Sequence, residues 1–97
     1  MKVITICGSM KFQDKMIEVA RELELKQGYC VIQCVYDLDK ENVSKEQMDK
    51  VVNAHWKKID LCDAIFVVNV GGYIGSSCNK EIEYALNHGK EVIYLEN

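Results

Sequence analysis

Residues 64–70 read AIFVVNV, an almost continuous apolar run, and this stretch decides the fold. A strand that is apolar on both faces is typical of the centre of a parallel sheet, because helices cover both sides of such a sheet. The run therefore predicts a buried central strand over 64–70, with helices packed on either side of it.

Three other stretches have the composition of strands. Residues 2–7 (KVITIC) are rich in β-branched side chains and end at Gly8-Ser9, which predicts a strand that runs into a tight turn. Shorter apolar runs over 30–35 (CVIQCV) and 91–95 (EVIYL) predict two more strands.

The stretches between the predicted strands have the apolar spacing of amphipathic helices. The predicted helices span 10–26, 44–61 and 78–87. Gly28 follows the first helix as a C-cap, and Gly89 follows the third. Ser44 and Gln47 have the spacing of a capping box at the start of the second helix.

Strands and helices alternate along the chain, which predicts a parallel sheet with right-handed crossovers. With 97 residues the chain has the length of one domain, spanning 1–97. We predict a small doubly wound α/β fold of the Rossmann or flavodoxin-like kind, with about four strands in the order 2-1-3-4 and helices on both faces. Because so short a sheet leaves its edges poorly covered, we expect a homodimer or a higher homo-oligomer.

Composition and charge exclude several classes of protein. An apolar fraction of 48% is enough to build a core, which excludes an intrinsically disordered chain. The apolar runs are far shorter than a membrane helix, and the first residues lack the apolar stretch of a signal peptide, so we expect no membrane partner and no secretion. A net charge of −3 argues against a nucleic-acid partner. Five cysteines without metal-site spacing indicate reduced thiols and a cytoplasmic location.

Two Gly/Ser-rich loops converge at the carboxyl edge of the predicted sheet, beside the switch in strand order where such folds bind ligands. One contains Gly8, Ser9, Met10 and Lys11, and the other spans 71–77. Each loop leads into a helix N-terminus, whose backbone N–H groups suit phosphate or another anion. The alternative is that these residues only form turns and helix caps.

Glu81 is the residue that departs most clearly from a packing role. It lies three residues after Cys78 and four before Ala85, so it shares the apolar face of the third predicted helix. A carboxylate on that face costs free energy unless it is paired or used, and its position places it over the predicted pocket. The alternative is a first-turn glutamate that the helix dipole stabilises.

His55 is the second unusual residue, because it lies on the apolar stripe of the second predicted helix. An imidazole titrates near neutral pH and can act as a general acid or base. The alternative is a histidine that packs in the core or at its rim. The residues alone thus make Glu81 and His55 the candidate catalytic groups.

Three stretches together resemble the nucleoside 2-deoxyribosyltransferase superfamily and its relatives, the 2′-deoxynucleoside 5′-monophosphate N-glycosidases. They are residues 6–11 (ICGSMK), 63–68 (DAIFVV) and 81–90 (EIEYALNHGK). The resemblance extends over nearly the whole chain. It implies cleavage or transfer at the N-glycosidic bond of a nucleoside or a nucleoside 5′-monophosphate.

The resemblance also implies roles for individual residues. Glu81 stands where those enzymes have the nucleophile that attacks the anomeric carbon, and His55 stands at the place of their second catalytic carboxylate. Asn69 replaces an acidic residue and is counted among the substrate-binding positions. The other positions that the resemblance places against the sugar and its 5′ group are Gly8, Ser9, Met10, Lys11, Gly75, Ser76 and Ser77. No metal and no organic cofactor is implied.

Three hypotheses for the function follow. The first is an enzyme that takes a small-molecule nucleoside or nucleotide as substrate and forms a covalent glycosyl-enzyme intermediate. The second is a non-catalytic nucleotide-binding module on the same scaffold, which His55 in place of the carboxylate favours. The third is a small structural or interaction domain.

Overall fold

The computed structural model describes the backbone of residues 1–97 and every side chain except that of Asp39. Within this described part, the strands are β1 (Val3–Gly8), β2 (Cys30–Ile32), β3 (Ala64–Val68) and β4 (Glu91–Tyr94). The α-helices are α1 (Gln13–Gln27), α2 (Lys45–Leu61) and α3 (Ser76–Asn87). Short 3₁₀ turns occur at Met10–Phe12, Leu38–Lys40 and Val70–Gly72.

The four strands form one parallel sheet in the order β2-β1-β3-β4, which confirms the predicted strand order. β1 pairs with β3 from Ile4 opposite Ala64 to Gly8 opposite Val68, so the two strands end together. The switch in strand order lies between these two strands. The loops that follow them therefore emerge next to each other at the carboxyl edge of the sheet.

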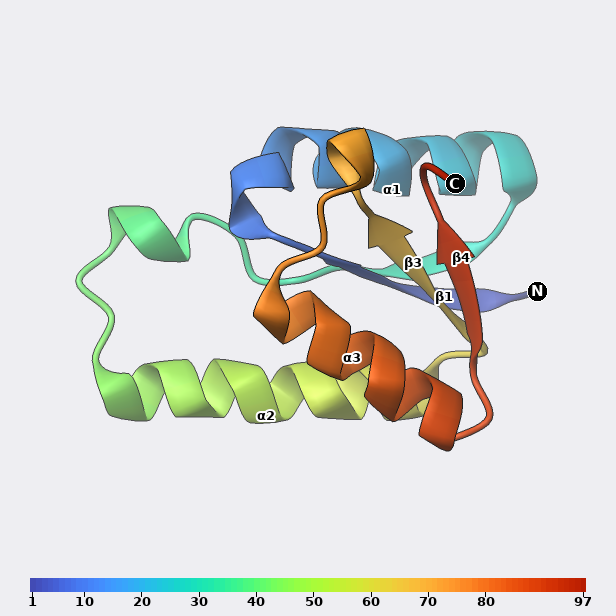
Figure 1. The fold of residues 1–97 in the computed structure, drawn as a ribbon. Coiled ribbons are helices and arrows are strands. Elements are labelled where there is room, and N and C mark those ends of the chain that lie inside the picture. The colour runs from blue at the N-terminus through green and yellow to red at the C-terminus, as the bar shows by residue number, and fades with distance from the viewer.

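Helices cover both faces of the sheet, as the sequence predicted. α1 lies on one face, and α2 and α3 lie together on the other (Figure 1). The central strand β3 supplies apolar side chains to both faces, with Val68 on the α1 side and Ile65 and Val67 on the side of α2 and α3. All three side chains are almost fully buried, which is what the apolar run over 64–70 indicated.

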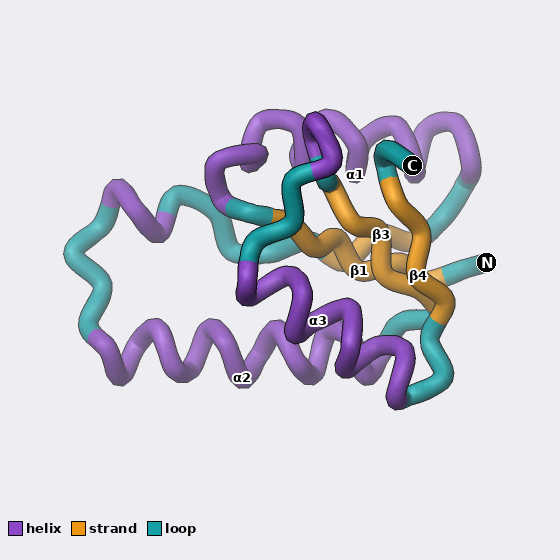
Figure 2. The backbone as a smooth tube through the Cα atoms, in the orientation of Figure 1, coloured by secondary structure: helices purple, strands orange, loops and turns teal.

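Two strands are shorter than predicted. β2 ends at Ile32 instead of residue 35, because it is an edge strand and pairs only with residues 3–5 of β1. β3 ends at Val68 instead of residue 70, because Asn69 bonds the main chain of Glu96 and a 3₁₀ turn follows. Figure 2 shows the long loop that follows β2 and carries the chain across to α2.

The predicted capping signals are confirmed at two helix ends. Gly28 has a left-handed backbone (φ 70°) and donates its N–H to the carbonyl of Glu24, which closes α1. Ser44 Oγ accepts the N–H of Gln47 at 3.1 Å, while Gln47 Oε1 accepts the N–H of Ser44 at 3.0 Å. α3 begins two residues earlier than predicted, because Gly75 is its N-cap.

All five cysteines are free thiols, as their spacing predicted. Cys7, Cys62 and Cys78 are buried, Cys34 is half-buried and Cys30 is exposed. Among the described residues, no helix combines the length and the apolar character that crossing a bilayer requires.

Candidate active site

A pocket of about 300 Å³ opens at the carboxyl ends of β1 and β2, between the sheet and the helices α2 and α3. Its wall combines an apolar part with a few polar groups, which is the usual composition of a small-molecule site. The described residues that line it are Gly8, Met10, Cys34, Val35, Leu38, Val51, Val52, His55, Trp56, Lys58, Ser77, Lys80 and Glu81.

Glu81 lies on the inward side of α3, as its spacing predicted. Its helix neighbours Cys78, Ile82 and Ala85 are buried, and the Glu81 side chain keeps 17% of its surface exposed at the pocket wall. Because α3 begins at Ser76, Glu81 lies in the second turn of the helix. The helix dipole acts mainly on the first turn, so it does not explain this inward carboxylate.

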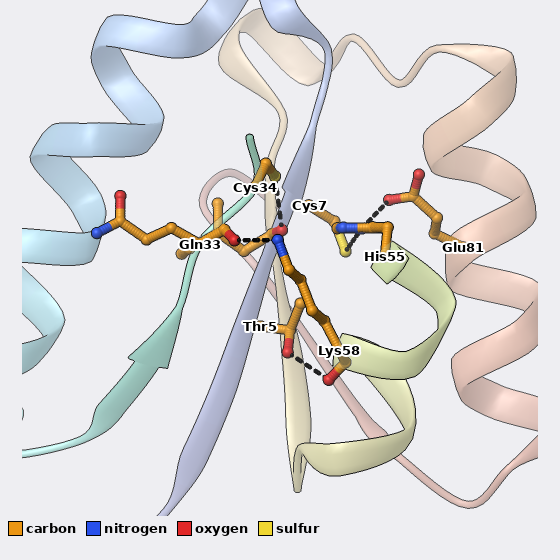
Figure 3. Close-up of polar contacts among 8 residues, drawn as sticks. Thr5, Cys7, Gln33, Cys34, His55, Lys58 and Glu81 are labelled. Atoms are coloured by element: carbon orange, nitrogen blue, oxygen red, sulfur yellow. Dashed lines mark hydrogen bonds and ion pairs between the residues drawn. The ribbon is translucent and has the colours of Figure 1, made fainter. Parts of the chain in front are cut away.

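His55 lies beside Glu81, with 3.0 Å between its Nε2 and the Oε1 of the carboxylate (Figure 3). Its side chain is 14% exposed. A hydrogen bond between β1 and α2 fixes this arrangement, since Thr5 Oγ1 donates to the carbonyl of Lys58 at 2.8 Å. Lys58 follows His55 by about one helical turn, so the bond sets the position of His55 relative to β1.

Cys7 completes a cluster of three side chains at the pocket. It lies on the same face of β1 as Thr5, and its Sγ is 3.6 Å from the Nε2 of His55. Burial, together with the charge of Glu81, raises the pKa of the Cys7 thiol well above its usual range, so the thiol is neutral at pH 7. Cys7 and Glu81 contact the same ring nitrogen. In a nucleophile–His–acid triad the two partners occupy opposite ring nitrogens, so this cluster is not such a triad.

The charge of Glu81 also affects the pKa of two further thiols, Cys34 and Cys78. Burial, and then that charge, raises the pKa of Cys34 and of Cys78 to about 12. Cys34 also donates its thiol proton to the carbonyl of Ile6 at 3.2 Å. These thiols are therefore neutral at pH 7.

The structure brings five of the predicted site residues together at the pocket, namely Gly8, Met10, His55, Ser77 and Glu81. They come from the end of β1, the turn that follows it, and the two helices on that face. The predicted convergence of the first Gly/Ser loop with the start of α3 thus holds for these positions.

Four other predicted residues lie outside the lining of the pocket. Ser9 caps the 3₁₀ turn after β1, Gly75 is the N-cap of α3, and Ser76 is the exposed first residue of that helix. The Nζ of Lys11 lies 3.3 Å from the ring centre of Tyr73. This cation–π contact joins the loop after β1 to the loop after β3.

Asn69 contacts the chain end instead of the pocket. Its Nδ2 donates to the carbonyl of Glu96 at 2.8 Å, and its Oδ1 accepts the N–H of Glu96 at 2.9 Å. Both atoms of the amide group therefore hold the segment after β4 against β3. These bonds give Asn69 a structural role, and Asn69 is not among the described residues that line the pocket.

Eight lining residues were not singled out as site residues by the sequence, and Trp56, Lys58 and Lys80 are three of them. Lys80 lies three residues after Ser77, so helical spacing from Ser77 could have indicated it. Lys58 donates from Nζ to the carbonyl of Gln33 at 2.9 Å, a contact between distant parts of the chain that no local pattern reveals. Trp56 belongs to the apolar stripe of α2 and gave no signal beyond packing.

The strand order and the position of the pocket define a small doubly wound α/β domain with a candidate ligand site at the carboxyl edge of its sheet. Among solved structures, the chain is similar to the CMP N-glycosidase BcmB of Clostridium botulinum, with a TM-score of 0.61 and 23% sequence identity. The similarity covers 96% of this chain and 70% of that chain, and at this identity it concerns the fold. The chain matches no protein-family model and no curated protein.

Proposed function

We propose that this protein cleaves the N-glycosidic bond of a nucleoside or a nucleoside 5′-monophosphate, by hydrolysis or by transfer of the sugar to another base. The observation that carries the proposal is the carboxylate of Glu81, which lies 3.0 Å from His55 at the wall of a pocket of ligand size. The fold similarity to a CMP N-glycosidase and the resemblance to the deoxyribosyltransferase superfamily both support it.

The proposed reaction consists of two substitution steps at the anomeric carbon of the sugar. The Glu81 carboxylate attacks the anomeric carbon while the C–N bond breaks and its electron pair leaves with the base, which forms a glycosyl ester on Glu81. Water or a second base then attacks the same carbon and releases the carboxylate. In hydrolysis the water gives its hydroxyl group to the sugar. Its remaining proton neutralises the base, which left with the electron pair of the C–N bond.

In this mechanism His55 acts on Glu81 and not on the leaving base. The nucleophile and the acid of a retaining glycosidase are about 5–5.5 Å apart, because they flank the bond that breaks. His55 Nε2 and Glu81 Oε1 are only 3.0 Å apart. His55 is therefore a positioning residue, whose N–H holds the carboxylate and stabilises its charge when the ester breaks. This role replaces the general acid that the sequence suggested.

The charges of the pocket wall favour a substrate with a 5′-phosphate. Lys58 and Lys80 both line the pocket. Ser77 lies in the first turn of α3, where backbone N–H groups have no partner within the helix and suit an anion. Trp56 and Val51 offer apolar surface for the base on the α2 side of the pocket.

Release of free base, measured by chromatography, tests the proposal. The substrates are ribo- and deoxynucleosides and their 5′-monophosphates, each with and without an acceptor base. We expect the wild-type chain to release base and Glu81→Gln to release it about 10³-fold more slowly or less, because an amide is a poor nucleophile. Glu83→Gln is the matched control, since Glu83 is an exposed residue of the same helix. Unchanged release by a folded Glu81→Gln protein would contradict the mechanism.

A second candidate is a nucleotide-binding module without catalysis. The lining of the pocket favours it, since Glu81 is the one carboxylate among the described lining residues. In this case Glu81 accepts a hydrogen bond from a sugar hydroxyl group and forms no covalent bond. No base release from any substrate, together with a rise in melting temperature on adding a nucleotide, would select this candidate.

A further inference from the structure

The cluster of Cys7, His55 and Glu81 has the composition and the spacing of a metal site. β1, α2 and α3 each supply one side chain, and the sulfur, ring-nitrogen and carboxylate-oxygen atoms all lie within 4.8 Å of one another. We propose that these three side chains bind a Zn²⁺ ion whose fourth coordination position faces the pocket. The site goes beyond the proposed glycosidic activity and does not depend on it.

The distances within the cluster are close to those of a zinc site. Tetrahedral bonds of about 2.3 Å to sulfur and about 2.0 Å to nitrogen or oxygen set the ligand atoms about 3.3–3.6 Å apart. Cys7 Sγ lies 3.6 Å from His55 Nε2, and that nitrogen lies 3.0 Å from Glu81 Oε1. The sulfur-to-oxygen separation, which is within 4.8 Å, must close by about 1.3 Å at most. Rotation of the partly exposed Glu81 side chain can supply this movement.

Protonation and charge also suit the ion. On binding, Cys7 gives up its thiol proton, Glu81 is a carboxylate, and His55 is a neutral imidazole with its proton on Nδ1. No described residue forms a hydrogen bond with that Nδ1, so it is free to hold the proton. The two negative ligands balance the charge of Zn²⁺, which removes the cost of an unpaired charge beside the apolar core.

The pocket gives the ion a route to the cluster. His55 and Glu81 line the pocket, and Cys7 lies fully buried next to them, with His55 between the other two side chains (Figure 3). Three protein ligands with an open fourth position are typical of zinc sites that keep a water molecule or a ligand atom. The mixture of sulfur, nitrogen and oxygen ligands favours Zn²⁺ over Mg²⁺.

For the proposed enzyme the bound ion is an inhibitor, and this consequence alone rests on the proposed function. The ion takes the electron pair of Glu81 that would attack the anomeric carbon. Occupancy by Zn²⁺ and turnover of a nucleotide therefore exclude each other.

Titration of the reduced chain with Co²⁺, followed by absorption spectroscopy, tests the site. Co²⁺ substitutes for Zn²⁺ in tetrahedral sites, and a thiolate bound to it gives a charge-transfer absorption in the near ultraviolet. We expect this absorption to saturate at one ion per chain. It should disappear on adding Zn²⁺ and persist on adding Mg²⁺.

Variants assign the absorption to the cluster. Cys7→Ser should lose the charge-transfer absorption, and His55→Ala and Glu81→Gln should bind Co²⁺ more weakly. Cys30→Ser is the matched control, because Cys30 is the exposed thiol, and its spectrum should equal that of the wild type. Circular dichroism checks the fold of each variant.

Two results would overturn the proposal. One is the absence of the absorption in the wild type or its survival in Cys7→Ser. The other, decisive where Cys7→Ser fails to fold, is unchanged Co²⁺ binding in both His55→Ala and Glu81→Gln. Because the readout is optical, the zinc site and the glycosidic activity are tested separately.

Discussion

The two faces of the sheet differ in what their helices bury. On the α1 face, the buried cluster contains apolar side chains alone, namely Ile6, Met16, Val19, Ala20 and Val68. On the face of α2 and α3, apolar residues also form a cluster, but Cys7 of that cluster contacts His55, and His55 contacts Glu81. Both faces therefore bury an apolar cluster, and the contacts among Cys7, His55 and Glu81 occur on the face of α2 and α3.

α2 is the structural reason for this difference. Ile59 is its one buried residue, and the N-terminal half of the helix extends past the sheet (Figure 1). Met48 and Val52 on that half are exposed although they belong to the apolar stripe. Because this half of α2 does not pack against the sheet, it leaves room for the pocket beside the carboxyl ends of the strands.

Met16→Ala on the α1 face should have the largest effect on stability. Met16 is fully buried, so we expect the free energy of unfolding in urea to fall by about 2–5 kcal/mol. Base release per folded molecule should stay close to the wild-type rate. Ile17→Ala is the control, because Ile17 is the next residue and is 43% exposed. An equal loss in both variants would break the comparison between the two faces.

His55→Ala on the opposite face should act mainly on turnover. Without its N–H the Glu81 carboxylate loses its fixed orientation, and we expect kcat for base release to fall about 100-fold with little change in KM. His55→Gln should restore part of kcat, because the amide group can donate to the same oxygen atom.

His88→Ala is the control for this variant, since His88 is an exposed residue just beyond α3. A loss of stability as large as that of Met16→Ala, with kcat unchanged, would show that His55 is a packing residue. The distinction between the two faces would then fail.

Thr5→Val should have the smallest effect, and it sharpens the comparison by testing how β1 and α2 are joined on the face of α2 and α3. Valine has a similar shape but cannot donate to the carbonyl of Lys58, so the free energy of unfolding should fall by about 1 kcal/mol. We also expect a few-fold decrease in kcat, because α2 then holds His55 less firmly. Thr5→Ser keeps the hydroxyl group and is the control. A fall in stability without any change in kcat would show that this bond does not position His55.

The order of the sheet and the faces of the helices could be predicted because their signals are local. The apolar run over 64–70 indicates a central strand by itself, and the capping box of Ser44 and Gln47 marks a helix start within four residues. Strand ends were predicted less well. Where β2 stops depends on how much of β1 it pairs with, and residues 30–35 do not contain that information.

The candidate site could be predicted only in part, because some of its contacts join segments that are far apart in the sequence. The inward position of Glu81 follows from its spacing to Cys78 within one helix. The contact between Cys7 and His55 depends on how α2 lies against β1, which the bond between Thr5 and Lys58 fixes in space. No pattern within one segment reveals such a contact, so Cys7 could not be identified as a site residue from the sequence.

β1 lies inside the sheet although it is the first strand of the chain. Its residue Ile4 pairs with Ala64, so during synthesis one side of β1 has no partner until β3 leaves the ribosome. Contacts between such distant residues slow folding, and a strand with unpaired N–H and C=O groups invites aggregation. A chaperone that binds extended apolar segments would therefore find its target in residues 3–8 of the nascent chain.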